Sequence, residues 1–123
     1  MRIAIAGGPR TGKTTLAADL DGLKLATDAL MHDHDWSGAS QAASEWLDLR
    51  CGDLVLEGVA VPRALRKWLK RNPEGKPVDR VVWLSSPHVE LSPGQATMAK
   101  GCETVWREIL PEHKARGVEI EER

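Results

Sequence analysis

The sequence lacks phenylalanine and tyrosine altogether, although it contains five tryptophans. The aromatic part of its core is therefore expected to consist of tryptophan. Cysteine is scarce too, since Cys51 and Cys102 are the only two, lie far apart and fit no metal-binding or redox spacing. Two reduced thiols are typical of a protein of the cytoplasm, and a cytoplasmic location is what we expect.

Long apolar runs are absent as well. No stretch approaches the roughly 20 apolar residues that span a bilayer, and the apolar residues 2–6 run into glycines rather than into a signal-peptide core. We therefore expect no membrane partner. Charge of one sign is also missing, because 17 Lys and Arg residues oppose 18 Asp and Glu residues, for a net charge of −1. This balance excludes a general electrostatic attraction to nucleic acid.

The sequence does contain a glycine-rich segment directly after its first apolar run. Gly7, Gly12, Lys13 and Thr14 fit the phosphate-binding pattern G-x-x-x-x-G-K-[ST] without a mismatch. A chance glycine-rich turn is the alternative, but a β-branched strand precedes the segment and a helix is expected after it, as the pattern requires. The residues expected to bind a nucleoside triphosphate are Gly7, Gly8, Pro9, Arg10, Thr11, Gly12, Lys13, Thr14 and Thr15.

Each of these positions has a chemical reason. Glycine lets backbone N–H groups approach an oxyanion closely, and the helix that begins near Gly12 directs its positive dipole end at the same phosphates. Lys13 can reach the β- and γ-phosphates, which makes it a catalytic candidate, and the Thr14 hydroxyl can ligate Mg²⁺. ATP and Mg²⁺ are therefore the expected cofactors.

The rest of the chain alternates between apolar runs and amphipathic stretches. The runs predict strands at residues 2–6, 23–27, 53–56, 80–84 and 117–121. Helices are expected from the glycine-rich segment to residues 21–22, from an N-cap at Ser37 to about Cys51, from Pro62 to Arg71, and along the stripe from Met98 to Ile109. This alternation favours one α/β domain over residues 1–123, with a five-stranded parallel sheet in a three-layer arrangement.

Two acidic residues are expected at the sheet edge that carries the glycine-rich segment, because the carboxyl ends of parallel strands meet there. Glu57 follows a buried apolar run, where an acid that holds Mg²⁺ is expected; a solvated strand-end acid is the alternative. Asp28 follows the second run, where it could take the proton of an acceptor hydroxyl or simply cap a turn. We predict that Thr14 and Glu57 are metal ligands and that Asp28 is catalytic.

Three more features carry polar chemistry. The run His32-Asp33-His34-Asp35 has metal-binding residue types, but adjacent loop residues seldom converge on one ion, so a solvated loop or a lid is favoured. Trp36 beside it could stack on a ring or belong to the core. Arg63 follows the third strand closely and could bind phosphate bidentately, so it is the third catalytic candidate. For its helix neighbours a solvated basic face is favoured over phosphate binding: Arg66, Lys67, Lys70 and Arg71.

At these residues the chain resembles the small P-loop kinases that phosphorylate nucleosides, nucleotides or related hydroxyl acceptors. In nucleoside monophosphate kinases the third strand ends in an acid followed by Gly, and an Arg follows a Pro soon afterwards. The stretch Glu57-Gly58-Val59-Ala60-Val61-Pro62-Arg63 is similar, with two extra residues before the Pro. The resemblance implies a P-loop NTPase fold of the kinase type, a magnesium-site acid at Glu57, a phosphate contact at Arg63 and a base at Asp28.

The chain also departs from that family. Most of these kinases carry an arginine-rich lid, whereas residues 86–95 contain no Arg, so the lid is expected to be minimal. Gln95 could contact a substrate oxygen, and Lys100 is the nearest cation on the following helix. Arg10 in the glycine-rich segment, or an arginine from a protein partner or a second copy, is expected to supply the missing charge.

The sequence thus predicts a kinase that transfers the γ-phosphate of ATP to a hydroxyl or phosphate acceptor: a nucleoside, a nucleotide or a polynucleotide end. The segment between the second and third strands is short for a full nucleotide-acceptor domain. The acceptor is therefore expected to be large and bound partly outside the protein, or very small. The alternative is a nucleotide-binding ATPase or switch module that acts through a protein partner, which the arginine-free lid favours.

Overall fold

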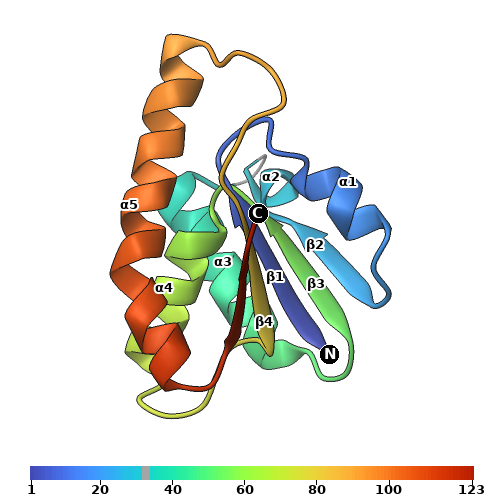
Figure 1. Ribbon diagram of the computed structural model, residues 1–123. Helices are drawn as coiled ribbons and strands as arrows, with labels where there is room; N and C mark the ends of the chain where they lie inside the picture. The colour runs from blue at the N-terminus through green and yellow to red at the C-terminus, as the bar shows by residue number, and fades with distance from the viewer. Residues whose placement is uncertain (32–33) are drawn as a thin grey trace.

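A computed structural model describes residues 1–31 and 34–123, and it shows a five-stranded, all-parallel sheet with helices on both faces (Figure 1). The strands are β1 Arg2–Gly7, β2 Leu23–Ala26, β3 Leu54–Gly58, β4 Arg80–Leu84 and β5 Glu119–Glu122. The helices are α1 Lys13–Ala18, α2 Thr27–Leu30, α3 Trp36–Leu49, α4 Val61–Arg71 and α5 Pro93–Ala115. The predicted α/β class and five-stranded parallel sheet are confirmed.

The sheet has the strand order β2-β3-β1-β4-β5, which explains the uneven distribution of its helices. Crossovers between parallel strands are almost always right-handed. The steps from β2 to β3, β3 to β4 and β4 to β5 all move one way across the sheet, so α3, α4 and α5 lie on one face. The step from β1 to β2 runs the other way, which places α1 on the opposite face (Figure 1).

Alternate residues of each strand supply the two cores. Ala4 and Ala6 of β1 face the larger core beneath α3, α4 and α5, whereas Ile5 faces the smaller core beneath α1. Tryptophan does form the aromatic part of the larger core: Trp68, Trp83 and Trp106 are buried there. Among the described residues, no helix is both long enough and apolar enough to cross a lipid bilayer.

One departure from the predicted element boundaries lies between β1 and β3. α1 ends at Ala18, before the expected cap at residues 21–22, because Gly22 is used to enter the next strand. Its φ is 120°, and a β-carbon at Gly22 would lie only 2.8 Å from the carbonyl carbon of Asp53. Only glycine allows this approach, which brings β2 alongside β3.

The start of α3 also differs from the prediction. Asp35, rather than Ser37, is the N-cap, and its carboxylate accepts a hydrogen bond of 2.7 Å from the backbone N–H of Gly38. Ser37 lies in the first turn instead. Its carbonyl oxygen accepts a hydrogen bond of 2.6 Å from Lys67 Nζ, so it links α3 to α4.

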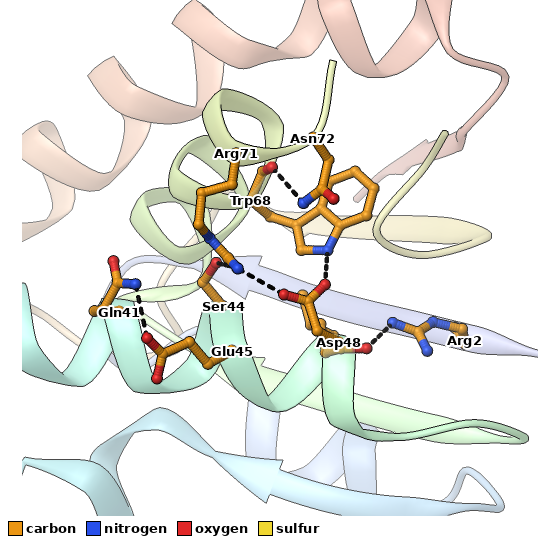
Figure 2. Close-up of polar contacts among 9 residues, drawn as sticks. Arg2, Gln41, Ser44, Glu45, Asp48, Trp68, Arg71 and Asn72 are labelled. Carbon is orange, nitrogen blue, oxygen red and sulfur yellow. Dashed lines mark hydrogen bonds and ion pairs between the residues drawn. The ribbon is translucent and has the colours of Figure 1, made fainter. Parts of the chain in front are cut away.

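Figure 2 shows a second contact between α3 and α4, in which Trp68 and Arg71 of α4 meet Asp48 of α3. The Asp48 carboxylate accepts hydrogen bonds from Trp68 Nε1 at 2.8 Å and from Arg71 Nη1 at 2.6 Å. Arg66 pairs with Glu108 of α5 at 2.9 Å. Three of the four basic neighbours of Arg63, namely Arg66, Lys67 and Arg71, therefore bond to other helices of the chain.

A ladder of three aromatic rings joins β4 to α5. The rings of Trp83 and Trp106 stack with centroids 5.6 Å apart, and the His113 ring follows at 6.2 Å from Trp106. His113 Nδ1 lies 2.9 Å from the carbonyl oxygen of Ile109 and must donate to it, which leaves Nε2 as the nitrogen that a second proton would occupy. Burial lowers the pKa of His113 from its ordinary value.

This depressed pKa predicts a loss of stability in mild acid. The unfolded chain protonates this histidine near pH 6.5, whereas the folded protein resists protonation until a lower pH. The free energy of unfolding should therefore fall as the pH drops below 6.5, with His113 contributing at most about 1.4 kcal/mol per pH unit. Urea denaturation of the wild type and of His113→Leu between pH 5 and 8 measures this slope.

The comparison isolates one group, because the other titrating residues are common to both proteins. The variant should lose the His113 share of the slope, whereas His34→Gln, at an exposed position, should keep it. Equal slopes in the wild type and His113→Leu would show that His113 is not the titrating group.

Candidate functional site

The candidate site lies at the carboxyl ends of β1 and β3, where the helices that follow these two strands leave the sheet on opposite faces. β1 and β3 are neighbours, with Ile5 opposite Glu57 and Ala6 opposite Gly58, yet α1 leaves β1 toward one face and α4 leaves β3 toward the other. This arrangement opens a crevice at the carboxyl ends of the two strands, where ligands bind in open parallel sheets. The topology therefore brings the glycine-rich loop, residues 7–12, beside Glu57.

The glycines of this loop are needed for close packing. A β-carbon on Gly7 would lie 2.6 Å from the carbonyl oxygen of Leu84, and one on Gly8 would lie 2.9 Å from the β-carbon of Ala99. Gly12, which precedes α1, has a φ of 90°. The Thr11 hydroxyl donates to the Gly8 carbonyl at 3.0 Å and closes the loop from inside.

Lys13 begins α1 and turns its amino group back into the loop. Nζ donates to the carbonyl oxygen of Gly8 at 2.6 Å, and only 8% of the residue is exposed. Burial lowers the pKa of Lys13, while the negative charge of Glu57 acts in the opposite direction. The buried ammonium group is a charge partner for an anion, and the nearby Glu57 carboxylate partly offsets that attraction.

Thr14 and Glu57 meet across the crevice. Thr14 Oγ1 donates to Glu57 Oε1 at 3.4 Å, and Glu57 is 6% exposed at the end of β3. Burial raises the pKa of Glu57, and the Lys13 charge works against this rise. A hydroxyl and a carboxylate are hard oxygen donors, which is the donor set that Mg²⁺ takes together with phosphate oxygens and water.

A cleft of about 370 Å³ unites most of the predicted residues. It is lined by Pro9, Arg10, Thr11, Gly12, Lys13, Thr14, Thr15, Asp28, Glu57, Val59, Gln95 and Met98. Among the described residues, no group of three or more His, Cys, Asp or Glu side chains is arranged to hold a metal ion.

Asp28 reaches the cleft from a short helix rather than from a strand end. It occupies the first turn of α2, is exposed, and follows Ala26, which pairs with Glu57 across the sheet. The preceding Thr27 is buried against Gly58, whose φ of 143° is open only to glycine. Gly58 is therefore what allows Asp28 to approach the cleft.

Replacing Gly58 by Ala is expected to displace Thr27 and Asp28. A β-carbon at Gly58 would lie 1.7 Å from Thr27 Oγ1, so the variant should lose at least about 2 kcal/mol of unfolding free energy through overpacking and backbone strain. Chemical denaturation measures the loss. Gly94→Ala is the matched control, since nothing lies within 4 Å of a β-carbon there, and equal stability of the two variants would contradict the clash.

Arg63 does not line this cleft. It lies in a neighbouring cleft of about 500 Å³, where its guanidinium carbon is 5.5 Å from the ring centroid of Trp36. A β-carbon on Gly101 of α5 would lie 3.3 Å from Arg63 Nη2, so the absence of a side chain there leaves room for the guanidinium. The two clefts share Met98. Trp36 is thus exposed beside a cleft and is not a core residue.

Sequence reasoning did not anticipate the role of His88. Its backbone N–H donates to the Arg10 carbonyl at 2.7 Å, and its Nε2 lies 3.1 Å from the Thr11 carbonyl. The segment 85–91 is therefore fastened to the tip of the glycine-rich loop. No local motif predicts this contact, because His88 and Thr11 are 77 positions apart in the sequence.

A further cleft of about 550 Å³ lies on the other side of the same loop. It shares Thr11, Gly12 and Thr15 with the first cleft and is completed by Ser85, Ser86 and Arg123 among others. Cys51 is exposed and lines neither cleft. Lys100 lines another cleft along α5, which also includes Gly8, Pro9 and Thr11 of the loop. His32 and Asp33 lie outside the described residues, so the choice between a lid and a metal site at that loop stays a prediction.

No protein-family model matches this chain, and no curated protein is significantly similar to it.

Proposed function

We propose that this protein is an ATP- and Mg²⁺-dependent phosphotransferase with a P-loop NTPase fold. The supporting observation is the convergence of Lys13, the Thr14–Glu57 pair and Asp28 in one cleft at the crevice between β1 and β3. Each supplies a different part of phosphoryl transfer: a buried cation, hard oxygen donors and an exposed carboxylate. A glycine-rich turn with a purely structural role has no need for this combination.

Two of the clefts that meet at the glycine-rich loop suit the two ends of ATP. The triphosphate takes the cleft of Lys13, where loop N–H groups and the ammonium group hold its oxygens. The nucleoside takes the cleft lined by Ser85 and Arg123, and Thr15 lies between the two as a contact for the α-phosphate. Thr14 and Glu57 would hold a bound Mg²⁺, which would supply positive charge to neutralise the phosphates.

The transfer step balances without a covalent protein intermediate. The acceptor oxygen forms a bond to the γ-phosphorus as the bond from that phosphorus to the β–γ bridging oxygen breaks, and ADP leaves with the electron pair. Asp28 takes the proton of an acceptor hydroxyl. Lys13 stays protonated and stabilises the charge on the leaving oxygens, so positioning and electrostatics supply the rate.

The neighbouring cleft of Trp36 and Arg63 is the place proposed for the acceptor. It adjoins the transfer site at Met98, and its stacked ring and cation suit an acceptor that carries a planar ring and an anionic group. A nucleotide or a polynucleotide end has both features. Arg63 accordingly contacts an acceptor phosphate in this proposal.

A second candidate function is an ATPase or switch module that needs a protein partner. It is favoured by one observation: segment 86–95, where an arginine-rich lid is expected, contains no Arg, and Gln95 is its residue in the triphosphate cleft. A partner or a second copy would then supply an arginine. Against it stands Asp28, a carboxylate for which a bare switch has no use.

An assay with γ-labelled ATP separates the two candidates. The panel comprises nucleosides, nucleotides and oligonucleotides with a 5′-hydroxyl, and Lys13→Met serves as the blank. Label transferred to any acceptor supports the phosphotransferase. Label released only to water, or only after a partner is added, supports the switch, and no turnover and no ATP binding would refute both.

A further inference from the structure

Arg10 at the tip of the glycine-rich loop has an unusual backbone. Its φ of 63° makes it the one non-glycine residue with a positive φ in the described part of the chain. A β-carbon disfavours this left-handed conformation, which glycine would adopt without strain. Such positions persist where the surrounding structure enforces them, and they gather at functional sites.

His88 enforces this conformation from the segment after β4. Its backbone N–H donates to the Arg10 carbonyl at 2.7 Å, and its ring nitrogen Nε2 meets the next carbonyl, that of Thr11, at 3.1 Å. Gly12 lies against the same ring, because a β-carbon there would be 3.0 Å from His88 Nε2. Two successive carbonyls and one glycine are thus held by a single side chain and its backbone.

The cations of the triphosphate cleft are few. Lys13 and Arg10 are the Lys and Arg residues that line it in the described chain, and the Lys13 ammonium already donates to Gly8. Arg63 lies in the neighbouring cleft beside Trp36. In contrast, the Arg10 side chain makes no hydrogen bond or ion pair within residues 1–31 and 34–123. A planar guanidinium group with free donors suits bidentate contact with a phosphoryl group.

We propose that Arg10 is a catalytic residue that contacts the γ-phosphoryl group during transfer, and that His88 is a positioning residue that holds the Arg10 backbone for this contact. The inference rests on the proposed phosphotransferase function. As the bond to the β–γ bridging oxygen breaks, charge develops on the oxygens around the γ-phosphorus, and the Arg10 guanidinium offsets it without giving up a proton. The chain then carries its own arginine where the segment after β4 has none.

Arg10→Gly is the decisive variant, because it removes the guanidinium and relieves the backbone strain together. Its melting temperature should not fall, and its Kd for ATP should stay within about threefold, as expected for a group that acts mainly in the transition state. Its kcat for transfer from ATP should fall about 100-fold. Added guanidinium chloride at millimolar concentration should restore part of kcat. Arg66→Ala, which removes the arginine paired with Glu108 of α5, should show neither the loss of kcat nor its rescue.

His88→Ala tests the positioning role. It should lower kcat with little change in KM for ATP, and the double variant with Arg10→Gly should be no slower than Arg10→Gly alone, because His88 acts through Arg10. Additive losses in the double variant would overturn this role of His88.

The outcomes also separate this inference from the proposed function. A wild type that transfers no phosphate to any acceptor refutes the proposed function and the inference with it. A wild type that is active, with Arg10→Gly equally active, refutes the inference alone. Loss of ATP binding in Arg10→Gly overturns it too, since Arg10 would then hold the ground state; rescue of kcat by guanidinium supports it.

Discussion

Replacing Lys13 by Met is expected to abolish ATP binding and, with it, phosphoryl transfer. The amino group is buried in the loop that would hold the triphosphate, so a bound phosphate would lose a hydrogen-bonded, desolvated charge partner. Truncating such a partner costs roughly 2–5 kcal/mol, or about 30- to 5,000-fold in affinity. Isothermal titration calorimetry with ATP and Mg²⁺ measures the loss.

The fold should survive this substitution. Methionine keeps the apolar stem of the side chain and removes a charge whose burial is already unfavourable, as the lowered pKa of Lys13 indicates. Lys70→Met, on the exposed side of α4, is the matched control and should bind ATP as the wild type does. Unchanged ATP affinity and activity in Lys13→Met would refute the assignment of the loop.

Replacing Asp28 by Asn is expected to separate binding from chemistry. The amide keeps the shape of the side chain at the first turn of α2 but cannot take a proton, so transfer to a hydroxyl should fall by about 10²- to 10⁴-fold. The affinity for ATP should stay close to that of the wild type. Single-turnover transfer and equilibrium binding, measured on the same preparation, give the two numbers.

The control for charge is Asp21→Asn, which removes an exposed carboxylate from the turn after α1 and should leave both quantities unchanged. A parallel loss of binding and transfer in Asp28→Asn would assign Asp28 to metal binding or to folding. Normal transfer in Asp28→Asn would mean that another group accepts the proton, and Glu57 is the other carboxylate in the cleft.

The strands and four of the five described helices were predicted because their signals are local, whereas the short helix α2 was not predicted. β4 was predicted with its observed bounds, and the stripe of Met98, Cys102, Val105, Trp106 and Ile109 falls within α5. The beginning of α4 at Val61–Pro62 follows from the fixed φ of proline. Errors occurred where a local signal had two uses: Gly22 could cap a helix or open a strand, and Asp35 and Ser37 could each cap α3.

Part of the candidate site could also be predicted from local signals, whereas the rest depends on long-range contacts. The glycine-rich loop, Lys13 and Thr14 could be identified from their order in the chain, because one turn and the start of one helix hold them all. That Asp28 shares their cleft while Arg63 lies in the next one depends on Thr27 against Gly58 and on Trp36 beside Arg63. These contacts join distant segments, so no spacing in the sequence encodes them.

The sequence by itself determined the alternation of strands and helices, the parallel sheet and the loop with its lysine, since periodicity and turn chemistry act over a few residues. The tertiary structure decided which strands are neighbours, which face each helix covers and which side chains meet. The strand order and the right-handed crossovers placed Glu57 beside β1, and the return of the chain after β4 brought His88 onto Arg10. These contacts depend on the packing of the whole chain, so only the tertiary structure shows that the glycine-rich loop lines a cleft with Glu57 and Asp28.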